Sequence, residues 1–281
     1  MVLPQPDDDA LTSGRTARPR TILMCEPTYF DVNYSINPWM DPSRPTSQAS
    51  GLDQWKYLHD LFVELGHEVE LVGARPGLPD MVFAANGATV IDGKALVARF
   101  RHAQRHDESE AYLEWFAQHG WTDVRMSRHV NEGEGDILFA GDVILAGTGF
   151  RTTRAAHDEV AEFFGRPVIS LTLVDPRFYH LDTALAVLDH NEVMYHPPAF
   201  DEQSRELLAA HFPDAVLAAR ADAEVFGLNA FSDGRHVVLP QAAVGLAGQL
   251  AERGFEPIGV DLAELLKAGG SVKCCTLELR R

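Results

Sequence analysis

The sequence contains little cysteine, little basic charge and no long apolar run, and each shortage excludes a class of protein. Three cysteines among 281 residues, two of them adjacent, do not make a disulfide framework, which favours a reducing compartment. Lys and Arg number 24 against 41 Asp and Glu, and the net charge of −17 argues against nucleic acid or an anionic membrane surface as partner. No stretch of about 20 apolar residues could cross a bilayer. The N-terminus has no apolar signal segment, so a cytoplasmic protein is expected.

Signatures of metal and nucleotide sites are also missing. Cys274 and Cys275 are adjacent rather than spaced as CxxC, and no paired histidines accompany them. Neither GxxxxGK[ST] nor a GxGxxG after a strand occurs. We therefore expect no metal and no nucleotide cofactor, and a small molecule as partner; a homo-oligomer is compatible with the sequence.

A repeated hairpin is the most informative feature of the sequence. Two short apolar runs flank a turn in each of four segments, and the Asp-Gly turns are strong hairpin signals. The segments are GATVIDGKALVAR (87–99), DILFAGDVILAG (136–147), TALAVLDHNEVMYHP (183–197) and LNAFSDGRHVVLP (228–240). A truncated fifth copy, CCTLELRR (274–281), ends the chain, and the strand TILMCEP (21–27) could complete it. Helical patterns separate the hairpins, so the sequence predicts about five strand–strand–helix–strand units in one α/β domain over 21–281, preceded by a disordered leader, 1–20.

One polar or nucleophilic residue precedes the first strand of every unit, at steps of 50, 46, 47 and 45 residues. We call these five the phase residues: Asn86, Asp136, Asp182, Asn229 and Cys274. If the units close into a ring, equivalent positions converge on its axis. Such a cluster is typical of a functional site rather than of a core.

Cys274 is the candidate nucleophile, because a thiolate attacks carbon centres readily and Lys273 beside a Gly-Gly loop would lower its pKa. Cys275 would point the other way along a strand, into the core. His180 lies two residues before Asp182, on the same face of an extended segment, and is the candidate acid and base.

Carboxylates are concentrated near these groups, in NEGEGD with Glu132, Glu134 and Asp136, and at Asp80 after a proline turn. Carboxylates beside a cysteine suggest a cationic substrate, and their bidentate geometry suits a planar guanidinium. Arg99 and Arg151 each follow a second hairpin strand, where they could hold an anionic group such as an amino-acid carboxylate.

The chain resembles the guanidino-group-modifying superfamily of arginine deiminases, dimethylarginine dimethylaminohydrolases, arginine dihydrolases and amidinotransferases. The resemblance covers nearly all of residues 21–281. Its carriers are MCEPTYFDVNYSINPWM (24–40), LPDMVFAANGA (78–88), NEGEGD (131–136), FYHLDTA (178–184), YHPPAFD (195–201) and LKAGGSVKCCTL (266–277). It implies a five-bladed α/β propeller, the pentein fold, in agreement with the repeat.

The resemblance also implies roles for individual residues. Cys274 would be the nucleophile and His180 the acid and base, with Glu132 as partner of the histidine and Glu134 as the alternative. The implied substrate contacts are Asp80 and Asp182 to the guanidinium, Arg99 and Arg151 to the carboxylate, and Asn37 and Asp136 in the same pocket.

A covalent thiouronium intermediate would split the reaction into two steps. Deiminases of the superfamily carry an acid where this chain has Asn86, and mammalian dimethylargininases carry lysine at Asp182. Both departures favour an arginine dihydrolase, which converts arginine to ornithine, ammonia and carbon dioxide. The alternatives are a dimethylarginine dimethylaminohydrolase, an amidinotransferase and a non-catalytic arginine-binding protein.

Overall fold

The computed structural model describes residues 14–281, whose strands form five sheets of three strands each. In every sheet the middle strand pairs antiparallel with one neighbour and parallel with the other. The sheets are β3 (Ala88–Ile91), β4 (Lys94–Val97), β5 (Asp123–Met126); β6 (Ile137–Ala140), β7 (Val143–Thr148), β8 (Val168–Thr172); β9 (Leu185–Asp189), β10 (Glu192–Tyr195), β11 (Val216–Leu217); β12 (Phe231–Ser232), β13 (His236–Pro240), β14 (Glu256–Val260); and β15 (Leu277–Glu278), β1 (Thr21–Cys25), β2 (Glu68–Val72).

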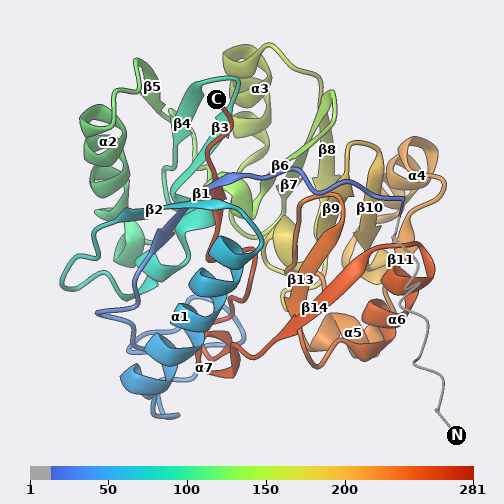
Figure 1. Cartoon of the computed structure of the whole chain (residues 1–281). Coiled ribbons are helices and arrows are strands. Elements are labelled where there is room, and N and C mark those ends of the chain that lie inside the picture. Colours follow the sequence, from blue (N-terminus) through green and yellow to red (C-terminus); the bar gives the residue numbers. More distant parts are fainter. Residues whose placement is uncertain (1–13) are drawn as a thin grey trace, which may run out of the picture.

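One long helix joins the two parallel strands of each sheet, because parallel neighbours need a crossover connection. In sheet order these helices are α2 (Glu108–Gln118), α3 (Arg154–Phe164), α4 (Glu202–His211), α6 (Val244–Glu252) and α1 (Gln48–Glu64). Two short helices, α5 (Arg220–Glu224) and α7 (Ala263–Leu266), lie in loops. Figure 1 shows the long helices around the periphery and the strands inside them. This is the predicted five-unit α/β propeller.

The two ends of the described chain meet in one sheet. β1 pairs antiparallel with β15, with Ile22 opposite Glu278 and Leu23 opposite Leu277. The N-terminal strand thus completes the unit that the C-terminus begins, which confirms the sequence prediction and closes the ring of five.

Local chemistry sets the hairpins and the helix ends. Asp92 and Gly93 both have positive φ, +51° and +75°, the geometry of a type I′ turn, which favours Asp-Gly. The Asp201 side chain caps α4 by accepting from the amide of Ser204 at 2.8 Å, and α3 ends at Gly165 with a φ of +65°. Apolar side chains fill the space between helices and sheets, as Val160 of α3 does with Ile144.

Residues 14–20 are not a disordered leader, contrary to expectation. The amide of Arg18 donates to the carbonyl oxygen of Asp233 at 2.9 Å, and Arg15 pairs with Glu192 at 2.6 Å. The rest of the expected leader, residues 1–13, lies outside the described residues.

Three of the phase residues lie on 3₁₀ turns that precede the first strand of their unit. Asn86 is on η2 (Ala84–Gly87), Asp136 ends η4 (Gly133–Gly135) and Asp182 is on η5 (Leu181–Thr183). Turn η4 contacts both η2 and η5, so three units bring their turns together. The axis is lined by polar turns rather than by apolar strands.

None of the helices within residues 14–281 is long and apolar enough to span a bilayer. Over the same residues, no group of three or more His, Cys, Asp or Glu side chains is arranged to hold a metal ion.

Candidate active site

The phase residues converge as predicted, and all five are at most 2% exposed. The Cys274 thiol donates to Asp182 Oδ2 at 3.1 Å and accepts from Asn229 Nδ2 at 3.2 Å. Two other units thus place one side chain each against the candidate nucleophile, although the three residues are far apart in the sequence.

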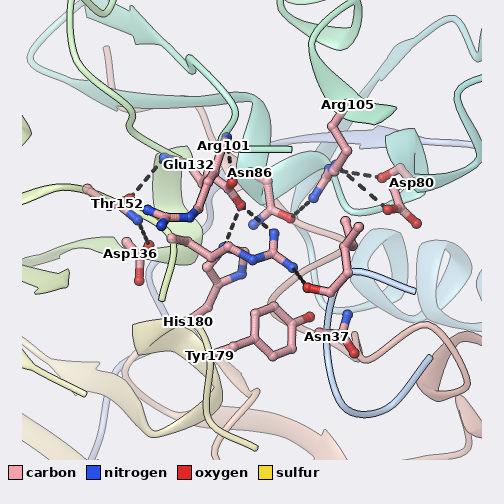
Figure 2. Close-up of polar contacts among 12 residues, drawn as sticks. Asn37, Asp80, Asn86, Arg101, Arg105, Glu132, Asp136, Thr152, Tyr179 and His180 are labelled. Carbon is pink, nitrogen blue, oxygen red and sulfur yellow. Dashed lines mark hydrogen bonds and ion pairs between the residues drawn. The ribbon is translucent and has the colours of Figure 1, made fainter. Parts of the chain in front are cut away.

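His180 is oriented by Glu132. Its Nε2 lies 2.8 Å from Glu132 Oε2, and both side chains are buried (Figure 2). A neutral ring that donates Nε2–H keeps its lone pair on Nδ1. Burial would raise the pKa of Glu132, but Arg151 and the bond to His180 outweigh it and hold this pKa well below its usual value. The carboxylate is therefore ionised and fixes the tautomer that leaves Nδ1 free to exchange a proton.

Glu134, the alternative partner of His180, points elsewhere. Its Oε2 accepts from Lys273 Nζ at 2.6 Å and from the amide of Glu278 at 3.2 Å, and its Oε1 pairs with Arg280. Because the Lys273 ammonium pairs with Glu134, it does not contact the Cys274 thiol.

The Cys274 thiol is accordingly not activated as the sequence suggested. Burial, and after it the neighbouring Asp182 carboxylate, raise the pKa of the thiol well above its ordinary value. In the resting protein the sulfur therefore carries its proton, which it donates to Asp182. A cation placed beside Asp182 would weaken this effect, since it would offset the carboxylate charge.

Asp80 is held in place by Tyr34 and Arg105. Its Oδ2 accepts from the Tyr34 hydroxyl at 2.8 Å, and Arg105 donates to its backbone oxygen at 3.2 Å. Burial raises the pKa of Asp80, while Arg105 and Tyr34 oppose the rise. The carboxyl is held in place, yet its Oδ1 has no hydrogen-bond partner.

Arg105 determines which way the Asn86 amide faces (Figure 2). Its Nη1 donates to Asn86 Oδ1 at 2.8 Å, while its Nε and Nη2 both donate to the carboxylate of Glu108 at 2.8 Å. Because a guanidinium only donates, it must meet the oxygen of the amide. The Nδ2 end of Asn86 therefore points away from Arg105, toward Gly135 and His180.

Four buried polar atoms of these residues lack a hydrogen-bond partner: Asp80 Oδ1, Asn86 Nδ2, His180 Nδ1 and Asp182 Oδ1. Buried polar atoms in native proteins are nearly always paired with protein, water or a ligand, so four such atoms at one site offer hydrogen-bonding positions to a bound molecule. Two carboxylate oxygens would accept from a guanidinium, and one amide would donate to an oxygen. The two carboxylate oxygens fit the predicted guanidinium substrate, whereas the amide donor fits an oxygen that a guanidinium does not have.

Of the two arginines predicted to contact the substrate, only one lies at the site. Arg151 is buried, donates to Glu132 Oε2 at 2.8 Å and to the Ile36 oxygen at 2.9 Å, and so reaches the site. Arg99 does not, because it is exposed and its Nε donates to the Ser127 oxygen at 2.8 Å. The two arginines therefore do not lie together, as they would have to in order to hold one substrate carboxylate.

Asn37 and Asp136 are occupied by backbone groups. Asn37 Oδ1 accepts from the Trp39 amide at 2.9 Å and its Nδ2 donates to the Ala268 oxygen at 3.0 Å, which ties the loop around 28–45 over the site. Asp136 accepts from the Leu181 and Thr152 amides at 3.0 and 3.1 Å. Both side chains therefore position neighbouring segments of the backbone.

Arg105 and Tyr34 were missed by the sequence reasoning. The spacing of Arg105 and Glu108, with Glu108 opening α2, is a weak signal of a buried i,i+3 pair. Nothing in the sequence around Tyr34 shows that its hydroxyl reaches Asp80, because that contact depends on how the loop folds back.

Gly135 is a sensitive position in this cluster, and we expect Gly135→Ala to lower kcat/KM by about 10²-fold because displaced catalytic groups cost this much. A Cβ here would lie 2.4 Å from Asn86 Nδ2 and 3.1 Å from His180 Nδ1. The matched control is Gly248→Ala on α6, where a Cβ meets open space. Steady-state kinetics on both variants, with a melting curve to show that each folds, test this. Full activity of Gly135→Ala would contradict the placement of the two side chains.

Comparisons with known proteins establish the family of this chain. The family model described as arginine deiminase matches residues 65–223, more than half of the chain. A relative from Mycobacterium tuberculosis named N(G),N(G)-dimethylarginine dimethylaminohydrolase is 56% identical over 265 residues, which cover 94% of this chain and 87% of the relative. The chain belongs to the arginine deiminase family. It is therefore a hydrolase that acts on C–N bonds of guanidino groups.

A second relative points to a different substrate within the family. ArgZ from Synechocystis, a bifunctional arginine dihydrolase/ornithine cyclodeaminase, is 38% identical over 92% of this chain, which spans only 37% of that longer protein. The structure of a single-substitution variant of the ArgZ N-terminal domain, covalently bonded to a reaction intermediate, matches with a TM-score of 0.89 and 36% identity. The match covers 93% of this chain and 98% of that domain. A dimethylarginine dimethylaminohydrolase structure at 19% identity and a TM-score of 0.77, covering 93% and 100% of the two chains, confirms the pentein fold.

Proposed function

We propose that this family member is an arginine dihydrolase that uses Cys274 to convert arginine to ornithine, two ammonia molecules and carbon dioxide. The observation that carries the choice is the orientation of Asn86, whose oxygen faces Arg105 and whose Nδ2 is unpartnered. A neutral N–H donor suits a ureido oxygen, the group that the first hydrolysis creates. An acid there would repel that oxygen and favour release of citrulline.

The first hydrolysis begins when a guanidinium binds between the free oxygens of Asp80 and Asp182. Its charge offsets that of Asp182, so Cys274 gives up its proton more easily; His180 Nδ1 takes this proton, and the thiolate attacks the guanidinium carbon. His180 protonates the departing nitrogen, ammonia leaves and a thiouronium remains. His180 then takes a proton from water, the C–S bond breaks and a ureido group is left. A covalently bound reaction intermediate in the ArgZ domain supports a covalent route.

The second hydrolysis repeats the chemistry on the ureido group. Asn86 Nδ2 donates to the ureido oxygen as negative charge develops there, which is the role of an oxyanion donor. Thiolate attack expels the second ammonia and leaves a thiocarbamate, and water releases a carbamate of ornithine. That carbamate loses carbon dioxide, so the carbon and both nitrogens are accounted for. Of the two arginines predicted for the carboxylate, we assign Arg151.

The alternative is dimethylarginine hydrolysis, favoured by the name of the 56% identical relative. The two are separated by offering arginine, monomethylarginine and dimethylarginine in turn and identifying amines, citrulline and ornithine by mass spectrometry. We expect ornithine from arginine, and slow turnover of dimethylarginine. Citrulline as the sole product from arginine, or faster release of dimethylamine from dimethylarginine, would contradict the proposal.

The pH dependence of kcat/KM should show an acidic limb near pH 6. Burial raises the pKa of Asp182 to about 6, although His180 and Cys274 oppose the rise. The carboxyl must be ionised to hold a guanidinium, so activity is lost as the pH falls through this value. In kcat/KM the limb reports the free enzyme, and a profile that is flat from about pH 5 to pH 7 would contradict the assignment.

The two arginines predicted for the carboxylate should differ when substituted. Loss of a buried charged hydrogen bond weakens binding by about 1.5–3 kcal/mol, so Arg151→Ala should raise KM by roughly tenfold or more. Arg99→Ala serves as the control, since the exposed side chain makes no contact with the cluster. Kinetics at saturating and limiting arginine distinguish them, and equal KM values for both variants would remove the role of Arg151.

A further inference from the structure

Asn229 is the one phase residue for which neither the sequence nor the mechanism above provides a role. It precedes β12 and is completely buried on the axis. Every polar atom of its side chain is engaged, in contrast to the orphaned atoms of Asn86 and Asp182, so a substrate is not needed to satisfy it. Its function must be sought in the groups that it contacts.

The Asn229 side chain holds the nucleophile from two sides. Its Oδ1 accepts from the backbone amides of Ser271 and Cys274 at 3.2 and 3.1 Å. Its Nδ2 donates to the backbone oxygen of Asp182 at 3.1 Å and to Cys274 Sγ at 3.2 Å. The two amides that Oδ1 accepts from fix the orientation of the group, so the end that meets the sulfur is a donor.

We propose that Asn229 is a catalytic residue whose Nδ2–H stabilises the Cys274 thiolate. Hydrogen bonds to charged groups are stronger than neutral ones, so this bond strengthens when the sulfur loses its proton. Burial and the Asp182 carboxylate both disfavour negative charge on this sulfur. Asn229 Nδ2 donates to the sulfur, and the backbone of Ser271 also favours its charged form.

The donor acts whenever the sulfur carries negative charge. Each hydrolysis ends when water has added to the carbon and the C–S bond breaks, with the electron pair returning to Sγ. A donor already in contact with Sγ receives that charge, which makes the thiolate a better leaving group. This role rests on the proposed function, because it concerns the same covalent intermediates.

The test measures thiol reactivity and needs no substrate. Iodoacetamide alkylation of Cys274, followed by peptide mass spectrometry at about pH 8, reports the thiolate fraction. Loss of the donor in Asn229→Ala should slow alkylation by roughly threefold to tenfold, because a smaller thiolate fraction is partly offset by the greater nucleophilicity of a more basic sulfur. Turnover should fall in kcat more than it changes KM.

The matched control is Thr276→Val, which removes a bond within the same loop without touching the sulfur. Thr276 Oγ1 donates to the Lys273 oxygen at 2.9 Å, and that oxygen keeps the amide of Thr276 as a second donor. Alkylation at the wild-type rate is expected for Thr276→Val. If Asn229→Ala alkylates as fast as the wild type, or Thr276→Val slows equally, Asn229 acts only as a loop support and the proposal is overturned.

A measurement on the wild-type protein decides the matter if Asn229→Ala does not fold. In a sample with ¹⁵N-labelled asparagine, the side-chain amide resonance of Asn229 should shift as Cys274 is titrated with base, and should not shift in Cys274→Ser. An unchanged resonance across the thiol titration overturns the proposal. If instead Cys274→Ser hydrolyses arginine normally, the proposed function itself fails, whatever Asn229 does.

Discussion

Cys274→Ala should abolish turnover, with kcat lower by at least about 10⁴-fold, since removal of a covalent nucleophile costs this much in well-studied hydrolases. Arginine should still bind, because the groups proposed to hold it, Asp80, Asp182 and Arg151, belong to other segments. Steady-state kinetics and calorimetric titration of the variant with arginine measure the two properties separately.

The other cysteines provide the controls for this substitution. Cys25 and Cys275 are buried in the apolar cores, and burial raises the pKa of Cys25 to about 12. Cys25→Ala and Cys275→Ala should lower the melting temperature but retain turnover, as expected for inert core thiols. If Cys274→Ala is active, or if Cys275→Ala folds normally but is inactive, the assignment of Cys274 as the nucleophile is wrong.

Asn86→Asp should change the product from ornithine to citrulline, with the ratio of the two altered by about tenfold or more, the effect of losing one well-placed donor. The new carboxylate is nearly isosteric and would be held by Arg105 as the amide oxygen is. It would still attract a guanidinium, so the first hydrolysis proceeds. It would repel the ureido oxygen that Asn86 Nδ2 is proposed to hold.

Asn191→Asp makes the same chemical change at an exposed position in the turn between β9 and β10. We expect the wild-type product ratio from this control. Product analysis by mass spectrometry at matched conversion compares the variants. Continued formation of ornithine by Asn86→Asp, at the wild-type ratio, would show that the amide does not govern the second hydrolysis.

The architecture was predictable because its signals are local. An Asp-Gly turn between short apolar runs forms a hairpin through its own backbone preferences, and repetition at a nearly constant step shows that the units are equivalent. Convergence of Asn86, Asp182 and Cys274 then follows from closure of the ring. The repeat positions alone predict that Cys274 contacts Asn229 and Asp182, which lie 45 and 92 positions before it.

The errors arose where the direction of a side chain decides the outcome. Lys273 adjoins Cys274 in sequence, but its ammonium points to Glu134, so proximity along the chain did not give electrostatic proximity. Arg99 and Arg105 are six residues apart, and the intervening loop turns only the second inward. A sequence pattern identifies the residue type, whereas the loop path determines which of two candidates reaches the site.

The choice between Glu132 and Glu134 shows the same limit. Both acids flank Gly133, whose φ of +56° and crowding against the backbone of Ala85, Asn86 and Ala88 make the turn specific to glycine. This turn sends the two carboxylates to opposite sides, one to His180 and one to Lys273. The sequence identified Glu132 and Glu134 as the two candidates. Only the backbone geometry shows which of them contacts His180.

The covalent intermediate is the central claim, and rapid acid quenching of the enzyme during turnover of arginine tests it most directly. Mass spectrometry of the digested protein should find an added mass on the peptide that contains Cys274, equal to arginine less one ammonia, which is the thiouronium of the first hydrolysis. The adduct should be absent from Cys25 and lost in Cys274→Ala. Turnover without any adduct on Cys274, or an adduct on another residue, would contradict the account.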